Sequence, residues 1–153
     1  MSEKPMRPFV QIATICQAPL LEANTQSLSL IRITDRVPVQ GVTDEMRPQP
    51  LQQFALVVIL KSGEMKGKYH LKIIPETPSG KRLQPFVNTV LFEGDERGVA
   101  IVMPVPLVAE EEGLYWFDVL IEDDLLTRIP LRVMYQKIQA IPPGMMFPGQ
   151  PTG

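Results

Sequence analysis

Sixteen prolines are distributed along the 153-residue chain, and their spacing limits the length of any helix that the chain can form. Proline removes a backbone donor and clashes with the preceding helical turn, whereas strands accept it in turns and at edges. Few stretches between the prolines show the 3.6-residue apolar repeat of an amphipathic helix. The sequence therefore predicts an all-β protein, with a single helical turn around residues 19–24 (PLLEAN).

Eight short segments have the composition of strands and are bounded by turn-forming residues such as KSGEMKG, TPSG and EGDERG. They are residues 9–16, 28–34, 53–61, 68–74, 86–92, 98–105, 114–122 and 126–135. Hairpins are predicted between the third and fourth, the fifth and sixth, and the seventh and eighth segments. Eight strands with short connections favour one antiparallel sandwich or barrel.

The stretch EEEGLYWFD carries a second indication of the fold. Glu111, Gly113, Tyr115 and Phe117 have the spacing found where immunoglobulin-like domains cross from one sheet to the other. There the tyrosine hydroxyl bonds back to the backbone of the crossing. We expect Gly113 to allow a close approach and Phe117 to lie in the core. These four residues predict a structural corner, and with it an immunoglobulin-like antiparallel β-sandwich.

Alternation along residues 114–122 separates a core face from an outer face. The predicted core residues are Tyr115, Phe117, Val119 and Ile121, and the predicted outer residues are Trp116, Asp118, Leu120 and Glu122. Trp116 is therefore expected on the outside of the sheet, where an aromatic side chain can contact a partner.

Two longer stretches, ICQAPLLEANTQSLSLIRITDR and GLYWFDVLIEDDLLTRIPLRV, resemble a family of small bacterial proteins that is known only as a domain of unknown function. The resemblance covers roughly residues 9–135 and implies a fold but no activity. We accordingly expect an N-terminal arm over residues 1–8, a sandwich domain over 9–136 and a Pro/Gly-rich tail over 137–153.

Net charge, the length of the apolar runs and the number of cysteines argue against several classes of protein. A net charge of −2 gives no basic stripe for nucleic acid, and no apolar run is long enough to span a membrane as a helix. The segment MSEKPMRPFV lacks the apolar run of a signal peptide, and the single cysteine, Cys16, cannot form an intrachain disulfide. We expect a cytoplasmic protein that binds neither nucleic acid nor membrane.

No set of residues in the sequence predicts catalysis. His70 is the one histidine and falls within a predicted strand, so neither it nor Cys16 has an evident catalytic partner. Phosphate-binding glycine motifs, a nucleophile elbow and Cys/His zinc clusters are all missing from the sequence. We expect a protein that is not an enzyme and holds no cofactor.

Charge is divided unevenly along the chain. Residues 61–82 carry six basic and two acidic residues, whereas residues 93–124 carry ten acidic residues and one arginine. In the predicted topology the acidic loops gather at one end, and Asp95, Asp123 and Asp124 are then candidates for calcium. A solvated rim and a docking face for a basic partner are the alternatives. Basic and acidic regions could also associate head to tail between copies.

The C-terminal stretch IPPGMMFPGQPTG is rich in proline and glycine but contains the apolar residues Met145, Met146 and Phe147. It is either a disordered terminus or a short segment that docks on the same chain, on a second copy or on a partner.

These features together predict a non-catalytic interaction or assembly module built on an immunoglobulin-like sandwich. Its expected contact surfaces are Trp116, the tail residues 145–147, and the free edges of the first and last strands. The alternative is a ligand-binding sandwich for carbohydrate, or one that depends on calcium.

Overall fold

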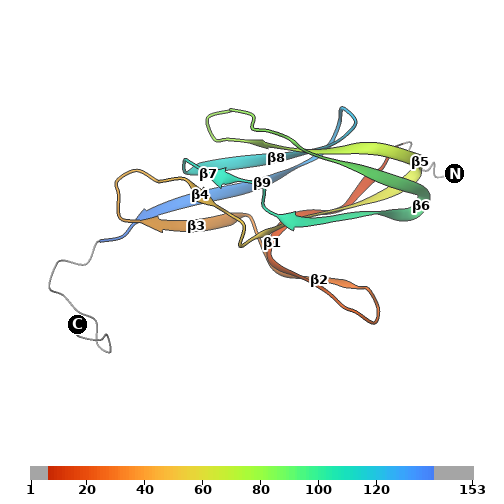
Figure 1. The fold of residues 1–153 in the computed structure, drawn as a ribbon, viewed down its shortest axis with the longest axis horizontal. Helices are drawn as coiled ribbons and strands as arrows, with labels where there is room; N and C mark the ends of the chain where they lie inside the picture. The colour runs from red at the N-terminus through yellow and green to blue at the C-terminus, as the bar shows by residue number, and fades with distance from the viewer. Residues whose placement is uncertain (1–6, 140–153) are drawn as a thin grey trace.

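The computed structural model describes residues 7–139, and these residues form nine strands joined by turns and loops without a helix (Figure 1). The strands are β1 (Phe9–Leu21), β2 (Leu28–Thr34), β3 (Arg36–Gly41), β4 (Gln49–Pro50), β5 (Ala55–Glu76), β6 (Phe86–Pro104), β7 (Val108–Ala109), β8 (Gly113–Ile121) and β9 (Asp124–Lys137). The expected helical turn at residues 19–24 is wrong, because β1 continues to Leu21 before the chain turns. Over the described range, no helix is present that could cross a membrane.

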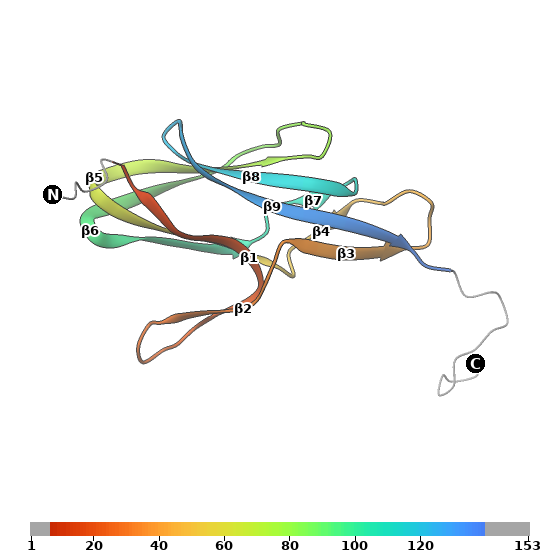
Figure 2. The ribbon, with the colours of Figure 1, turned by 180° about the vertical axis from the view of Figure 1, so that it is seen from behind.

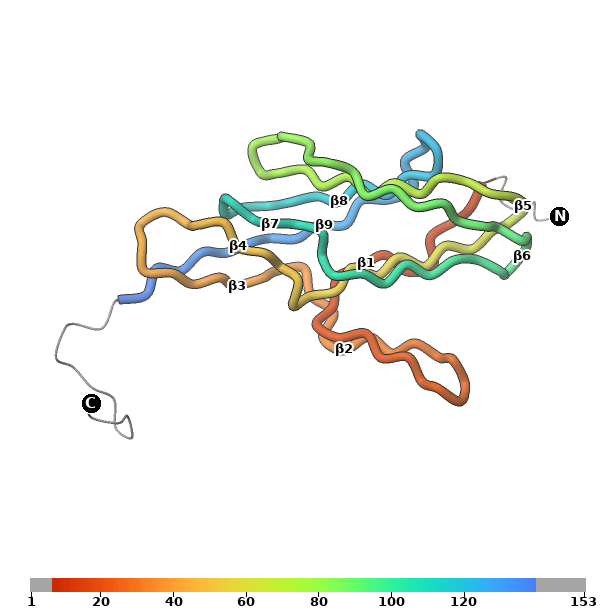
Figure 3. The backbone as a smooth tube through the Cα atoms, viewed as in Figure 1, coloured from red at the N-terminus to blue at the C-terminus, as the bar shows by residue number. Residues whose placement is uncertain are grey.

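The two longest strands, β5 and β6, are shared between the two layers of the sandwich. Residues 55–61 of β5 pair with β1, and residues 71–76 pair with β8. β6 follows β5 antiparallel along nearly its whole length (Figure 3). The hairpins predicted inside residues 53–74 and 86–105 are therefore wrong. In both places the chain bends into the other layer instead of folding back on itself.

Close backbone approach at the bend explains this outcome. A Cβ atom on Gly98 would lie 1.8 Å from the carbonyl oxygen of Leu60, so only glycine fits there. The buried Ser62 hydroxyl donates a 2.5 Å hydrogen bond to the Arg97 carbonyl oxygen across the two strands. The pairing register shifts between Lys61 and Lys66, which gives the ribbon the irregularity that a sharp bend needs.

Strand order defines an immunoglobulin-like β-sandwich. One layer runs β2, β1, the first half of β5 and the second half of β6; the other runs from the first half of β6 through β5, β8 and β9 to β3. β3 pairs parallel to β9, whereas the other strand pairs are antiparallel. The hairpin predicted between the last two segments is confirmed as β8–β9.

The core lies between the two layers and contains the residues predicted for it. Tyr115, Phe117, Val119 and Ile121 of β8 are buried, and they face Leu56, Val58 and Leu60 from the opposite layer. Alternate residues of each strand point inward, as expected for strands that bury one face. The predicted core face of residues 114–122 is confirmed.

The positions of the free sheet edges agree only in part with the prediction. β1 pairs on both sides only at Ile15 and Cys16, and β9 only at Arg132 and Val133. Residues 9–14 of β1 and 124–131 of β9 therefore keep one free side, as predicted, whereas β2 and β3 cover the other parts of these strands (Figure 2). The short strand β3 (RVPVQG) covers β9; sequence reasoning missed it because Pro38 interrupts its apolar alternation. The described edges of the large sheet also include β2, β3 and the outer side of β6.

Candidate functional site

Glu111, Gly113 and Tyr115 form the predicted corner. The Tyr115 hydroxyl donates to the Glu111 carbonyl oxygen at 2.6 Å and accepts from the Glu111 N–H at 3.2 Å. Gly113 has a φ of 129°, and a Cβ atom there would lie 2.8 Å from the Cβ of Pro78. Burial raises the pKa of Tyr115, so its phenol stays protonated as a donor. The corner positions β8 and is structural.

The Glu111 side chain extends the corner to the loop between β5 and β6. Its Oε1 atom accepts from the Ser79 N–H at 3.1 Å and from the Ser79 hydroxyl at 2.9 Å. A cavity of about 360 Å³ lies beside these groups, lined also by Lys81 and Leu83. The corner already uses the Glu111 carboxylate and the Tyr115 hydroxyl, so neither group is a free acid or base in this cavity.

Trp116 lies on the outer face of β8, as predicted, but it is half-buried and not open. The Arg128 guanidinium of β9 lies 4.7 Å from the centroid of its ring, in the geometry of a cation–π contact. Arg128 also donates from Nε to Asp118 Oδ1 at 2.6 Å and from Nη2 to Glu76 Oε2 at 2.9 Å. Arg82 donates to the second oxygen of the buried Asp118 at 3.1 Å.

These ion pairs and the cation–π contact link side chains of β5, β8 and β9 on the outer face of the sheet. Each carboxylate oxygen of Asp118 accepts a hydrogen bond from an arginine. The hydrogen bond to Asp118, followed by the negative charges of Asp118 and Glu76, raises the pKa of Arg128. One face of the Trp116 ring is used inside the chain. The outward positions of β5, β6, β8 and β9 in this layer hold no phenylalanine, tyrosine or second tryptophan.

Part of the basic segment lies beside part of the acidic segment, because residues 71–76 of β5 pair with β8 and the turn after β8 follows directly. Lys72 Nζ donates to Asp123 Oδ1 at 3.1 Å. The His70 N–H donates to Glu122 Oε1 at 2.8 Å, and this backbone bond is the main reason that the pKa of Glu122 is lowered. The charge asymmetry read from the sequence is thus partly satisfied inside one molecule.

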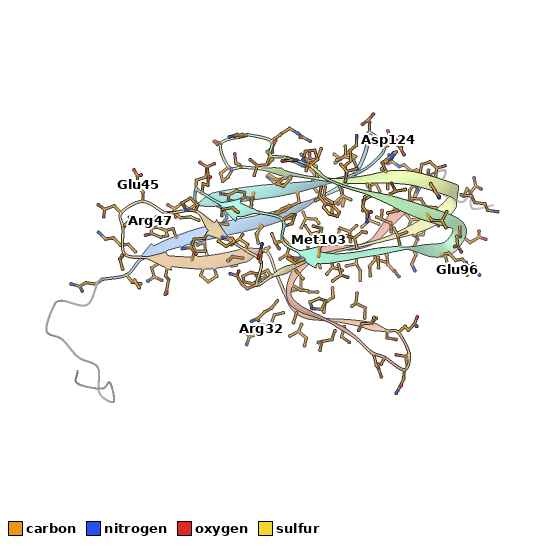
Figure 4. The ribbon with its side chains drawn as sticks, viewed as in Figure 1. Arg32, Glu45, Arg47, Glu96, Met103 and Asp124 are labelled. Carbon is orange, nitrogen blue, oxygen red and sulfur yellow. The ribbon has the colours of Figure 1, made fainter. Side chains whose placement is uncertain are left out.

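The acidic loops do not gather at one end as expected. Glu45 lies at one end of the long axis and Glu96 at the other, with Asp124 on a separate turn (Figure 4). Within residues 7–139, no three His, Cys, Asp or Glu side chains are placed to hold a metal ion, and Asp95, Asp123 and Asp124 form no such group. The loops were expected together because the strands predicted at residues 28–34, 86–92 and 114–122 would all end on the same side of the sandwich. Residues 93–97 instead lie within the continuous strand β6.

Cys16 is buried, and burial raises the pKa of its thiol. It lies in the β1 layer, whereas His70 is exposed on the other layer. No nucleophile–base pair forms between them. Met145, Met146 and Phe147 lie outside the described residues.

A projecting hairpin, which sequence reasoning did not single out, carries the largest concentration of exposed apolar side chains. β1 leaves β5 after Cys16 and pairs with β2 from residue 15 to residue 21, so the hairpin extends away from the body of the sandwich (Figures 1 and 2). We call residues 17–34 the arm. Its exposed large apolar side chains, 43–69% accessible, are Leu20, Leu21, Ile31 and Ile33.

The arm is anchored by a small second core. Leu28 and Leu30 pack against Cys16, Ala55 and Val57 on the outer side of the β1–β5 layer. At the tip, the Glu22 N–H donates to the Ser27 carbonyl oxygen at 2.8 Å and closes the turn. The arm is therefore a packed element whose remaining apolar surface stays open.

An open hollow of about 360 Å³ lies at the foot of the arm. Its lining includes Ala13, Ile33, Ile129 and Pro130. The hollow places Ile33 of the arm beside apolar side chains of β1 and β9, and Thr14, Thr34, Asp35 and Arg36 complete its lining. The combined surface is the best candidate functional site among the described residues.

The class of protein follows from the strand order and the tyrosine corner: this is a single immunoglobulin-like β-sandwich. The chain belongs to the Family of unknown function (DUF6941), whose model matches residues 11–134. Among solved structures, the chain is similar to an immunoglobulin-like protein from Pseudomonas aeruginosa. That similarity has a TM-score of 0.43 and 16% identity, and it covers 84% of this chain and 97% of the other. No curated protein matches the chain.

Proposed function

We propose that this protein is a non-catalytic interaction module that binds an apolar surface of a protein partner through the arm. The observation that carries the proposal is the group of four large apolar side chains exposed on one anchored hairpin. Apolar residues scattered singly over a surface are ordinary, but several on one projecting element are typical of a contact site. By the β1–β2 register, Leu20, Ile31 and Ile33 share one face of the hairpin, whereas Leu21 lies on the face of Leu28 and Leu30.

The surroundings of these side chains support protein as the ligand. Polar residues Gln17, Glu22 and Arg32 border the apolar group on the same hairpin, as a polar rim borders an interface core. Leu28 and Leu30 hold the arm in place, so less conformational entropy is lost on binding than for an unanchored loop.

The test is affinity capture from the native host with two matched baits. The variant Leu20→Ser/Ile31→Ser removes apolar surface from the arm, and Val42→Ser/Val108→Ser removes exposed valines elsewhere. The proposal predicts a protein retained by wild type and by the valine variant but lost with the arm variant. A set of captured proteins that is identical for all three baits contradicts it.

Folding of each bait is checked first. Both pairs of substitutions replace exposed side chains, so each should change the free energy of unfolding by no more than about 0.5 kcal/mol per site. Direct titration of the captured protein with each bait then gives the affinity ratio. Loss of at least roughly tenfold in affinity is expected for the arm variant alone.

A further inference from the structure

The outer side of β6 is a sheet edge that lacks the usual protection against pairing. Residues 86–92 read FVNTVLF and contain neither a charge nor a proline. Three other edges are protected: β3 contains Arg36 and Pro38, β2 contains Arg32 with a left-handed φ of 56°, and the free part of β9 contains Arg128 and Pro130. Residues 9–14 of β1 carry no charge or proline, but β1 contacts β9. Among the described strands, β5 alone pairs with β6.

The backbone groups of this edge can be assigned from hydrogen bonds on the far side of β5. The His70 N–H donates to Glu122 and the His70 carbonyl accepts from the Glu122 N–H, so both groups point toward β8. His70 faces Thr89 in the β5–β6 register. In an antiparallel ladder, two residues that lie opposite each other either both direct their backbone N–H and C=O groups toward the other strand or both direct them away from it. The N–H and C=O of Thr89 therefore point to the free edge.

The same alternation places the backbone groups of Val87 and Leu91 on the free edge, because they lie two residues from Thr89. Their side chains share the outer face and are 51% and 48% exposed. The edge is thus symmetric about Thr89, with one exposed apolar side chain two residues away on either side.

We infer that residues 86–92 form the interface of a two-fold dimer, in which β6 of one copy pairs antiparallel with β6 of a second copy about Thr89. In that register Thr89 faces its own equivalent, and Val87 of each copy faces Leu91 of the other. A two-fold contact requires a self-complementary strand, and this strand meets that requirement. This surface is distinct from the arm, so the inference goes beyond the proposed function.

Net charge at the two ends of the strand favours the antiparallel direction. Lys81 and Arg82 before the strand carry +2, and residues 93–97 after it carry three acids and one arginine, a net −2. Arg82 and Glu93 already pair inside the chain, with Asp118 and Arg97, so the effect is one of net charge and not of new ion pairs. Antiparallel pairing about Thr89 brings the acidic end of each copy to the basic end of the other, on both sides of the axis. Parallel pairing would bring like charges together, which is unfavourable.

The experiment is sedimentation velocity of the full chain from about 1 μM to about 1 mM, a range that detects micromolar dimers. Wild type is expected to show a reversible dimer. Leu91→Lys places like charges near the axis and should raise the dissociation constant by at least roughly tenfold. Thr89→Pro removes an N–H that points outward, which an edge strand tolerates, and should give the same result.

Two controls separate this interface from others. Val102→Lys alters an exposed valine on the second half of β6, and Leu20→Ser/Ile31→Ser alters the arm; both should leave the dimer unchanged. In wild type, amide exchange at Val87, Thr89 and Leu91 should slow as dimer forms, while Asn88 and Val90 are protected throughout. A monomer at every concentration overturns the inference. A dimer that survives both Leu91→Lys and Thr89→Pro, or one that a control variant dissociates, also overturns it.

Discussion

Tyr115 and Glu111 exchange two hydrogen bonds through a single side-chain oxygen, one donated to the Glu111 carbonyl and one accepted from its N–H. These two bonds hold the segment between β7 and β8 against the start of β8. Tyr115 and Glu111 are four residues apart in the sequence, so the contact is local even though the corner joins the two layers.

Replacing Tyr115 with phenylalanine is expected to lower the free energy of unfolding by about 1–3 kcal/mol, because two backbone groups lose their partner in a partly buried site. Urea unfolding of the purified chain measures the change. Tyr69→Phe is the matched control, since the Tyr69 hydroxyl makes an exposed 3.3 Å bond to Lys66. Equal effects of the two variants would contradict the role given to the corner.

Asp118→Asn is expected to destabilise the chain by about 1–3 kcal/mol, because the buried carboxylate receives both Arg82 and Arg128. Asp123→Asn, which breaks the exposed pair with Lys72, should cost no more than about 0.5 kcal/mol. Trp116 is the one tryptophan in the chain, so the tryptophan fluorescence spectrum reports on its contact with Arg128. Unchanged emission in Asp118→Asn would show that Asp118 does not position Arg128.

Stability in acid should depend on Glu122. Its pKa is lowered in the folded chain, chiefly by the His70 N–H, so its carboxylate favours folding above the ordinary glutamate pKa near 4.3. That contribution is lost as the pH falls through the lowered folded value. Glu122→Gln should therefore flatten the decline in stability below about pH 4.3, with Glu64→Gln as control. Parallel curves for wild type and Glu122→Gln would refute this assignment.

Gly98→Ala tests the bend between the two layers. The new Cβ atom would meet the Leu60 carbonyl oxygen, so backbone must move, and a loss of about 1–3 kcal/mol or more is expected. Ala100→Ser, at an exposed position of the same strand, serves as control. A melting temperature of Gly98→Ala that equals the control's would mean that β5 and β6 do not approach as closely as described.

Local patterns predicted the parts of the fold that depend on local geometry. The corner at Tyr115 and the core face of β8 follow from the spacing of a few neighbouring residues, and both are confirmed. The path of β5 was not predictable in this way. KSGEMKG has the composition of a reversing turn, but whether such a segment reverses a strand or carries it to the other layer depends on contacts with β6, such as Ser62 with Arg97.

The arm was missed for a related reason. Alternation assigns one apolar face to a strand, whereas LSLIRIT has apolar residues on both faces, one used in the second core and one left open. The sequence does not show which face is covered. Trp116 was placed correctly on the outer face, but its contact with Arg128 depends on the β8–β9 register and could not be read from composition.

The most direct test of the interaction module is site-specific photo-crosslinking in the native host. A photoreactive amino acid is placed at Ile31 on the arm and, as a control, at Val108 of β7, in the separate two-stranded sheet; both positions are exposed. A discrete protein adduct at position 31 that is missing at position 108 is the expected result. Equal adducts at both positions, or none at position 31, would contradict the claim that the arm is the contact surface.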